Sequence, residues 1–366
     1  MIPIARPFIG DEEIQAVTDV LKSGMIAQDG RVSEIEEEFA RLCGTKYAVA
    51  VNSGTAALHT ALKIAGIKKG DEVITTPFTF IATANTILMQ GAKPVFADVI
   101  GDTFNIDPKK IKEKVTSKTK AIVAVDLYGH LCDYDEIGRI AEKNKLIVVE
   151  DACQSINAEY KGKKAGSFGS ISAFSFYATK NITCGEGGIL TTENKDYAEN
   201  ARLFRQHGRS NLSAYDYSDV GYNYRMTDIS ASILLVQLKK LDFVTKKRIE
   251  NADCLNKGLG KIKGIKVPIA KKGYKHVFHQ YTLRVEDNFK LNRDELMSRL
   301  NKKGIGCGIY YPKPLHLCQH IKKLGYKEGD FPVAEKLSKQ VLSLPIHPNV
   351  TKEQLRYIID TFLEIK

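Results

Sequence analysis

The spacing of apolar residues predicts two helices at the start of the chain. Ile14, Val17 and Leu21 recur at intervals of three and four residues, so they share one face of a helix over residues 11–23. The same spacing recurs over residues 33–42.

From residue 47 onward, short and almost continuous apolar runs alternate with helical stripes. Such runs are typical of parallel strands buried on both faces, and the stripes between them are long enough for helical crossovers. The expected strands are 47–51, 72–75, 94–97, 121–125, 146–150, 171–176 and 188–192. The expected helices begin close to Gly54, Phe80, Pro108, Tyr134, Asp196 and Asp228. The alternation predicts an α/β fold with a large, mostly parallel sheet.

The pattern changes after the last of these helices. A long helix is expected over residues 243–258, followed by a β-rich stretch at 277–284 and a helix at 293–303. With 366 residues, the chain has the length of two ordinary domains. We therefore expect a large domain over residues 1–242 and a smaller C-terminal α/β domain over residues 243–366.

The composition argues against several classes of protein. Hydrophobic residues make up 43% of the chain, yet no stretch approaches the roughly 18 apolar residues of a membrane span. The first residues, MIPIARPFIGDEE, lack the long apolar segment of a signal peptide. The seven cysteines are scattered without a CxxC pair, so neither a zinc site nor a disulfide framework is expected. We expect a cytoplasmic protein without a metal.

The formal net charge of +11 permits two interpretations. The lysines are spread along the chain as short doublets, which is typical of a solvated surface. A positive field can also favour an anionic substrate, such as a phosphorylated one. No basic arm and no nucleic-acid-binding motif accompany the charge, so we expect no nucleic-acid partner.

Polar residues follow several of the expected strands, and each position has two interpretations. In open parallel sheets, ligands bind beyond the carboxyl ends of the strands. Gly54 and Thr55 can bind a phosphate through a hydroxyl and the free N–H groups of a helix N-terminus, or they can form an ordinary N-cap turn. Phe80 can lie flat over a planar ligand, or it can pack in the core.

Two further segments carry candidate catalytic groups. Asp151 directly follows an apolar run, where its carboxylate can pair with a protonated ring nitrogen or cap the next helix, and Gln154 can face the same site. Lys180 lies five residues after Ser175 and just before a glycine-rich turn. A partly buried lysine has a lowered pKa and can attack a carbonyl, whereas a lysine on the surface is an ordinary cation.

Together these positions match the needs of one cofactor. A phosphate site, a flat apolar cover, a carboxylate for a ring nitrogen and a Schiff-base lysine are what pyridoxal 5′-phosphate requires. Nine segments also resemble the DegT/DnrJ/EryC1/StrS family of sugar aminotransferases: SGMIAQDGRVSEIEEEFA, VNSGTAAL, GDEVITTPFTFIATAN, GAKPVFADV, TKAIVAVDLYGH, VVEDACQS, FSFYATKNITCGEGG, GYNYRMTD and YYPKPLHL. This resemblance implies the aspartate-aminotransferase-like fold, which is fold type I of the pyridoxal-phosphate enzymes.

The resemblance implies a role for each candidate residue. Lys180 forms the Schiff base and moves the proton during transamination, and Asp151 pairs with the pyridine nitrogen. The other implied cofactor contacts are Gly54, Thr55 and Ser175 at the phosphate, Phe80 on the ring face and Gln154 at the phenolic oxygen.

Two further roles are implied for residues in the second half of the chain. Asn223, in GYNYRMTD, is implied to reach the cofactor phosphate of a partner subunit, which predicts a homodimer with two shared active sites. His316, in YYPKPLHL, is implied to lie near the sugar nucleotide.

The resemblance also implies the reaction, in which L-glutamate aminates a keto-sugar on a nucleotide carrier for glycan or polysaccharide biosynthesis. Lys180 favours transamination, since some relatives with histidine in its place are dehydratases. The YYPKPLHL and SGMIAQ segments favour amination at C3 and ATKNITCGEGG favours C4; we expect C3. The alternatives are a regulatory protein and a non-catalytic protein that retain the fold.

Overall fold

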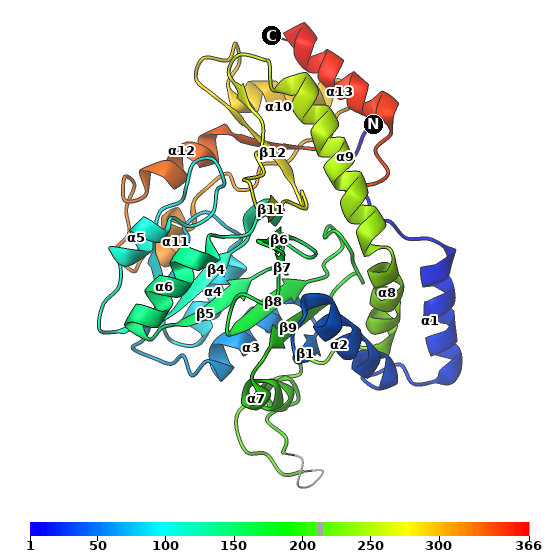
Figure 1. Cartoon of the computed structure of the whole chain (residues 1–366), viewed down its shortest axis with the longest axis vertical. Coiled ribbons are helices and arrows are strands. Elements are labelled where there is room, and N and C mark those ends of the chain that lie inside the picture. The colour runs from blue at the N-terminus through cyan, green and yellow to red at the C-terminus, as the bar shows by residue number, and fades with distance from the viewer. Residues whose placement is uncertain (211–214, 366) are drawn as a thin grey trace.

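The computed structural model describes residues 1–210 and 215–365 and shows a large α/β body with a smaller α/β unit at the top of Figure 1. The helices are α1 (Asp11–Ser23), α2 (Gly30–Cys43), α3 (Gly54–Ile64), α4 (Ala82–Met89), α5 (Pro108–Lys112), α6 (Tyr134–Asn144), α7 (Lys195–Arg205), α8 (Asp228–Lys239), α9 (Leu241–Leu259), α10 (Arg293–Lys302), α11 (Gln319–Lys322), α12 (Pro332–Gln340) and α13 (Lys352–Ile365), with 3₁₀ turns η1 (Leu127–Gly129) and η2 (Leu315–Leu317). The strands are β1 (Tyr47–Val51), β2 (Glu72–Thr75), β3 (Lys93–Phe96), β4 (Thr119–Val125), β5 (Ile147–Asp151), β6 (Glu159–Tyr160), β7 (Lys163–Lys164), β8 (Ile171–Ser175), β9 (Gly188–Thr192), β10 (Ile265–Lys266), β11 (Tyr274–Lys275), β12 (Tyr281–Val285) and β13 (Val341–Leu344).

The large body is built on a seven-stranded sheet in the order β1-β9-β8-β5-β4-β2-β3. Strands β8, β5, β4, β2 and β3 are parallel to one another, and β9 is antiparallel to both β1 and β8. Strands β1 and β8 therefore point the same way, and the carboxyl ends of all strands except β9 lie at one edge. The mostly parallel sheet predicted from the sequence is confirmed.

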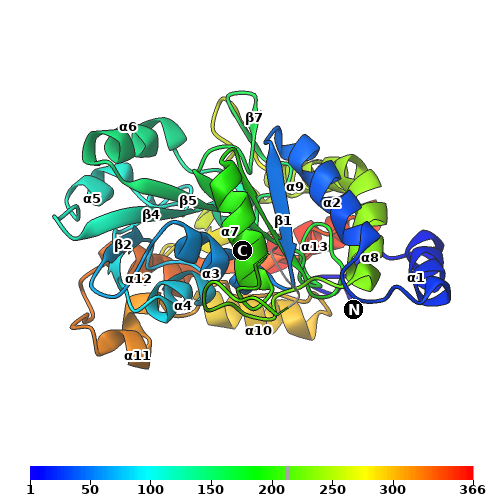
Figure 2. The ribbon, with the colours of Figure 1, turned by 90° about the horizontal axis from the view of Figure 1, so that it is seen from below.

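Alternate residues of each strand bury opposite faces of the sheet. In β1, Ala48 and Ala50 join a core with helices α2, α6 and α8, whereas Val49 and Val51 join a second core with α3 and α7. Figure 2 shows α5 and α6 on one side of β4 and β5, with α3 and α4 on the other. Strands covered on both faces need apolar residues at every position, which explains the continuous apolar runs in the sequence.

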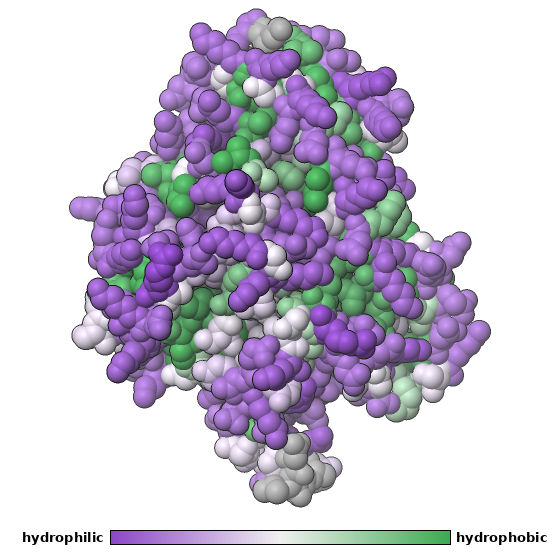
Figure 3. Space-filling view, viewed as in Figure 1, coloured by the Kyte–Doolittle hydropathy of each residue, from purple (hydrophilic) through white to green (hydrophobic). Residues whose placement is uncertain are grey.

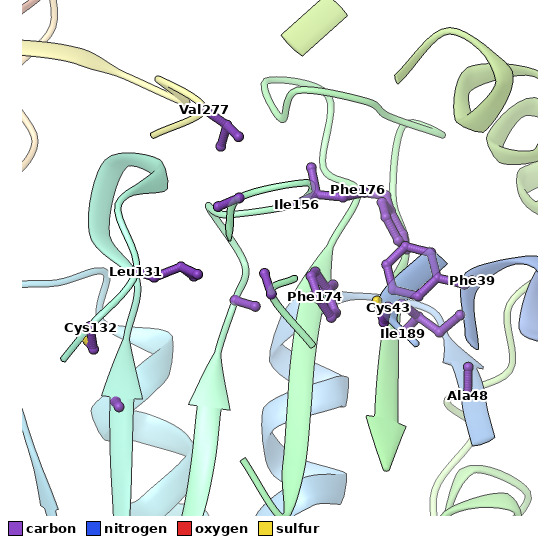
Figure 4. Packing of buried hydrophobic residues seen from close by; sticks show 14 of the residues in the cluster. Phe39, Cys43, Ala48, Leu131, Cys132, Ile156, Phe174, Phe176, Ile189 and Val277 are labelled. Atoms are coloured by element: carbon purple, nitrogen blue, oxygen red, sulfur yellow. The ribbon is translucent and has the colours of Figure 1, made fainter. Parts of the chain in front are cut away.

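Aromatic rings fill the first of these cores. The Phe39 ring of α2 meets the edges of Phe174 and Phe176, with ring centroids 4.9 Å and 5.5 Å apart (Figure 4). Edge-to-face pairs of this kind stabilise a core beyond the area they bury. The packing holds the residues before and after Ser175, the last residue of β8.

A separate core forms the C-terminal unit. Its buried residues come from α9, β12, β13, α10 and α13, together with Ile2 at the start of the chain. The Ile2 N–H donates to the carbonyl of Gly304 at 2.7 Å, and the Gly306 N–H donates to the carbonyl of Ile2 at 2.8 Å. The first residues therefore pack with the C-terminal unit, although we expected residues 1–242 to belong to the large domain.

One expected strand begins later than its sequence suggests. The β-rich stretch at 277–284 contains strand only from Tyr281, where β12 pairs with β10 and β13. The preceding residues are held by the loop after β4, since the Val277 N–H donates to the carbonyl of Gly129 at 3.0 Å. Pairing with a loop instead of a strand directs the segment before β12 toward the end of the large sheet.

The apolar stripe of α1 does not face the core. Glu13 and Val20 are the buried residues of α1, whereas Ile14 is 62% exposed and Leu21 is 56% exposed. The Glu13 carboxylate turns inward because it meets the ammonium of Lys240 at 2.8 Å. The stripe is therefore left uncovered on a single chain.

The rest of the visible surface is mostly hydrophilic. Figure 3 shows charged and polar side chains over most of one face, with small hydrophobic areas between them. Among the described residues, no helix combines the length and hydropathy needed to cross a membrane.

A buried ion pair ties helices α2 and α7 to strand β1. The Arg205 guanidinium meets the Glu36 carboxylate at 2.5 Å and donates to the carbonyl of Ala50 at 2.6 Å, while the same carboxylate accepts the Ala50 N–H at 2.9 Å. Arg202 reaches Glu36 and the carbonyl of Ala48 from farther away, both at 3.3 Å. Only Arg205 is buried, since 6% of its side chain is exposed compared with 41% for Arg202.

Arg205→Ala should lower the free energy of unfolding by about 3–5 kcal/mol, because the Glu36 carboxylate would stay buried without its closest cation. Arg202→Ala is the matched control on the same helix and the same carboxylate, and it should cost at most about 1 kcal/mol. Urea unfolding followed by circular dichroism measures both values. Equal losses in the two variants would contradict the assignment.

Candidate active site

A pocket of about 470 Å³ lies at the edge of the sheet where the parallel strands end. Ser53 follows β1, and Asp151 and Ser175 are the last residues of β5 and β8. Ligands of open α/β sheets bind at this edge. Seven of the nine site residues predicted from the sequence line the pocket, namely Gly54, Thr55, Phe80, Asp151, Gln154, Ser175 and Lys180.

Lys180 is half-buried in this pocket. Its N–H donates to the carbonyl of Tyr177 at 2.8 Å, which closes the turn after β8. Burial lowers the pKa of Lys180, while the charges of Cys153 and Asp151 oppose that shift. Within the described part of the chain, the amine forms no ion pair shorter than 4.0 Å. Lys180 is therefore neutral more often than a surface lysine, and only the neutral amine is a nucleophile.

Asp151 is a buried carboxylate without a cationic partner in residues 1–210 and 215–365. Its Oδ2 accepts the hydroxyl of Thr83 at 2.8 Å, and its Oδ1 accepts the N–H of Cys153 at 3.3 Å. Burial raises the pKa of Asp151, although the bonds from Thr83 and Cys153 and the charge of Lys180 act in the opposite direction. A protonated nitrogen of a ligand in the pocket would favour the ionised form. The position therefore suits the ring nitrogen of pyridoxal phosphate.

Gly54 and Ser175 lie in close contact on the far side of the pocket. The Ser53 hydroxyl caps α3 by accepting the N–H of Ala56 at 3.1 Å. Gly54 and Thr55, the first residues of α3, line the pocket, and N–H groups at this position in a helix have no intrahelical acceptors. A Cβ at Gly54 would lie 2.6 Å from the Ser175 Cβ. Glycine is therefore required here for the helix N-terminus to approach β8, and together with Thr55 it offers the donors that a phosphate needs.

Two hydrogen bonds hold the side chain of Gln154, and its amide nitrogen has a second hydrogen that it can donate. Its Oε1 accepts the N–H of Tyr128 at 2.9 Å, and its Nε2 donates to the Tyr311 hydroxyl at 3.3 Å. An amide nitrogen carries two hydrogens, so the second is available to an oxygen of a ligand. Burial raises the pKa of Tyr311, which keeps that phenol protonated.

Phe80 lies at the mouth of the pocket and is 54% exposed. The alternative interpretation, in which Phe80 packs in the core, is therefore wrong. Its ring is 6.2 Å from the ring of Tyr311 and tilted by 39°. A half-exposed ring at this position can cover a planar ligand.

Two predicted residues lie outside the pocket of this chain. Asn223 is exposed, and its carbonyl accepts Nδ2 of Asn52 at 3.2 Å. His316 is fully buried, with Nε2 2.9 Å from Glu335 and its ring 4.7 Å from Phe331. The structure does not place His316 beside a substrate, because these C-terminal residues enclose its imidazole. The role of Asn223 in a partner subunit remains a prediction.

Sequence reasoning missed several residues of the pocket wall, chiefly Thr83, Cys153, Tyr177, His279, Tyr310 and Tyr311. Cys153 and Tyr177 lie two residues beyond Asp151 and Ser175, so proximity to the strand ends could have identified them. Tyr310 and Tyr311 begin the YYPKPLHL segment, so the resemblance of that segment could have identified them. His279 has no comparable signal in its neighbouring sequence, and its place in the pocket follows from tertiary contacts.

The arrangement fits pyridoxal 5′-phosphate. A nucleophilic lysine, a buried carboxylate that lacks a cation, a helix N-terminus and an aromatic cover all face one space of suitable size. In the part of the chain that the structure describes, no group of three or more His, Cys, Asp or Glu side chains is arranged to hold a metal ion.

Comparison with known proteins gives the same result. The sequence model of the DegT/DnrJ/EryC1/StrS aminotransferase family matches residues 7–363. The chain is 41% identical to the pleiotropic regulatory protein of Geobacillus stearothermophilus over 96% of this chain and 94% of that protein. It is 37% identical to the GDP-perosamine synthase of Caulobacter vibrioides over 98% of this chain and 96% of that enzyme.

A solved structure shares both the fold and the cofactor chemistry. The PLP form of the putative sugar aminotransferase Spr1654 from Streptococcus pneumoniae matches with a TM-score of 0.95 and 31% sequence identity. The match covers 100% of this chain and 98% of that one. The predicted fold, that of the aspartate-aminotransferase-like enzymes, is confirmed.

Gly54→Ala should weaken the binding of pyridoxal phosphate by about tenfold to a hundredfold, since overpacking of this kind costs about 1–3 kcal/mol. Gly30→Ala is the matched control, because Gly30 also begins a helix and no atom lies within 4 Å of its added Cβ. Titration of each apoprotein with the cofactor, followed by visible absorption, gives the affinities. An unchanged affinity in Gly54→Ala would show that the close contact with Ser175 is unimportant.

Proposed function

The chain belongs to the DegT/DnrJ/EryC1/StrS aminotransferase family, and we propose that it transfers the amino group of L-glutamate to the keto group of a nucleotide-linked sugar. It is a sugar aminotransferase, and its cofactor is pyridoxal 5′-phosphate. The observation that carries the proposal is the convergence of Lys180, Asp151 and Gly54 on one pocket.

Some side chains of the pocket bind the cofactor, and Lys180 transfers a proton. When bound, pyridoxal phosphate supplies an electron sink conjugated to the reacting carbon. Lys180 acts as nucleophile and then moves a proton through its Nζ, which burial keeps partly neutral. The buried carboxylate of Asp151 would hold a proton on the ring nitrogen, and this would keep the electron sink effective. Phe80 shields one face of the pocket from water.

The remaining contacts orient the cofactor. The helix N-terminus at Gly54 and Thr55, with the hydroxyl of Ser175, offers hydrogen-bond donors to the phosphate. The spare hydrogen of Gln154 Nε2 is available to the phenolic oxygen. These contacts would hold both ends of a planar cofactor, and Lys180 lines the same pocket.

Charge and family support the choice of substrates. L-Glutamate and a nucleotide-linked sugar are both anionic, and the chain carries a net charge of +11. The relative from Caulobacter vibrioides is a GDP-perosamine synthase, which supports a nucleotide-linked acceptor. We propose C3 rather than C4 as the aminated carbon, because the YYPKPLHL and SGMIAQ segments resemble the branch that acts at C3.

The Geobacillus relative, a pleiotropic regulatory protein, favours a regulatory role as the second candidate. A protein that only binds has no need of a neutral lysine beside a buried carboxylate. Lys180 and Asp151 both retain the burial and the pKa shifts that catalysis uses. The geometry therefore supports an enzyme, and any regulatory effect would follow from its product.

The purified protein, supplied with L-glutamate, should aminate at least one member of a panel of nucleotide-linked 3-keto and 4-keto sugars. Lys180→Ala is the control variant, and it should fold normally yet turn over no substrate, because only the nucleophile is removed. Formation of 2-oxoglutarate measures turnover, and NMR of the product identifies the aminated carbon. Absence of turnover across the panel would refute the sugar substrate, and turnover by Lys180→Ala would refute the role of the lysine.

We also propose that the active unit is a homodimer with shared sites. The apolar stripe of α1, with Ile14 and Leu21, is exposed on the single chain and suits burial against a second copy. Asn223 is exposed and bonded to Asn52, the residue before the Ser53 cap. This position at the rim of the site suits contact with a phosphate in the neighbouring subunit.

Mixing the inactive variants Lys180→Ala and Asn223→Ala should restore part of the activity, because a mixed dimer contains one site with both native residues. Each variant incubated alone under the same conditions is the control. Turnover after subunit exchange, divided by that of the wild type, measures the rescue. No rescue despite proven exchange of subunits would contradict the shared site.

A further inference from the structure

His279 forms part of the pocket wall and is not one of the residues assigned to the cofactor or to proton transfer. Its imidazole lines the pocket together with Lys180 and Gln280, and only 6% of the residue is exposed. It lies in the segment before β12, which the bond from Val277 to the carbonyl of Gly129 directs toward the pocket. The ring is thus held in place by backbone contacts on the C-terminal side of the site.

Asn181, the residue after Lys180, determines which nitrogen of the ring carries the proton. The Asn181 Nδ2 donates to the carbonyl of Val277 at 3.3 Å, so its Oδ1 faces Nδ1 of His279 at 3.2 Å. An amide oxygen can only accept, and therefore Nδ1 of the imidazole must donate. In the neutral ring Nε2 is then the hydrogen-bond acceptor, and Nδ1 is already occupied.

The surroundings keep this imidazole neutral. Burial lowers the pKa of His279 well below its ordinary value, and the positive charges of Lys180 and Arg248 lower it further. The Arg248 guanidinium also donates to the carbonyls of Phe278 and His279 at 3.1 Å and 3.2 Å. These bonds fix the backbone that carries the ring. His279 therefore presents an acceptor at neutral pH and does not act as a base.

We propose that Nε2 of His279 accepts a hydrogen bond from a hydroxyl group of the keto-sugar and thereby selects a hydroxylated acceptor. The proposal rests on the sugar substrate proposed above. The carboxylates of L-glutamate only accept hydrogen bonds, and its amine must face the reacting carbon. The acceptor Nε2 of His279 can therefore bind a sugar hydroxyl, which donates a hydrogen bond, and it has no matching donor in L-glutamate.

Two substitutions distinguish a role of His279 in binding the sugar from a role in folding. In His279→Asn the amide can still donate to Asn181 in place of Nδ1, but no acceptor reaches the position of Nε2. In His279→Gln the side-chain oxygen can occupy that position.

The half-reaction with L-glutamate, followed as loss of the visible absorption of the cofactor, should be unchanged in both variants. The kcat/KM for the sugar should fall about two- to tenfold in His279→Asn, as expected for one hydrogen bond, and recover in His279→Gln.

A sugar lacking one hydroxyl identifies the group that is recognised. With the wild-type enzyme, removal of the relevant hydroxyl should lower kcat/KM, whereas with His279→Asn the same removal should have little further effect. A parallel loss in both half-reactions would show that His279 is only structural and would overturn the proposal, as would an unchanged sugar half-reaction. Failure of the wild type to aminate any sugar would instead refute the proposed substrate, with the glutamate half-reaction intact.

Discussion

Burial of the central sheet on both faces is the constraint on which the rest of the molecule depends. With helices on either side, the strands can meet solvent only at their ends, and the parallel arrangement gathers those ends at one edge. Polar residues that follow β1, β5 and β8 are therefore brought together although they are distant in sequence. The pocket is a consequence of this topology, and the chemistry depends on which side chains occupy the strand ends.

Two of those side chains have pKa values shifted by the same physical cause in opposite directions. Burial raises the pKa of the carboxyl of Asp151 and lowers that of the amine of Lys180, because a low dielectric disfavours both charged forms. A neutral amine is useful at once as a nucleophile. A cationic nitrogen of a ligand would favour the ionised form of Asp151 and so offset the cost of burying that carboxylate.

Much of this could be predicted from the sequence because it depends on local pattern. The pattern of the sequence predicts the seven strands of the large sheet to within two residues, and residues at or just after the carboxyl ends of β1, β5 and β8 line the pocket. Local pattern does not determine contacts between segments that are distant in sequence. The stripe of α1 faces outward because Glu13 pairs with Lys240, and His316 is enclosed by Glu335 and Phe331. His279 reaches the pocket only because a loop holds the segment before β12.

The packing of Ile2 against Ile305 and the core of the C-terminal unit has a consequence for the order of assembly. Residues near the start of the chain leave the ribosome long before the residues that cover them. During synthesis they have no partner, while the large sheet between them can already form from contacts close in sequence. Completion of the C-terminal core is therefore a late step, because it brings together Ile2 and Ile305, which are far apart in the sequence.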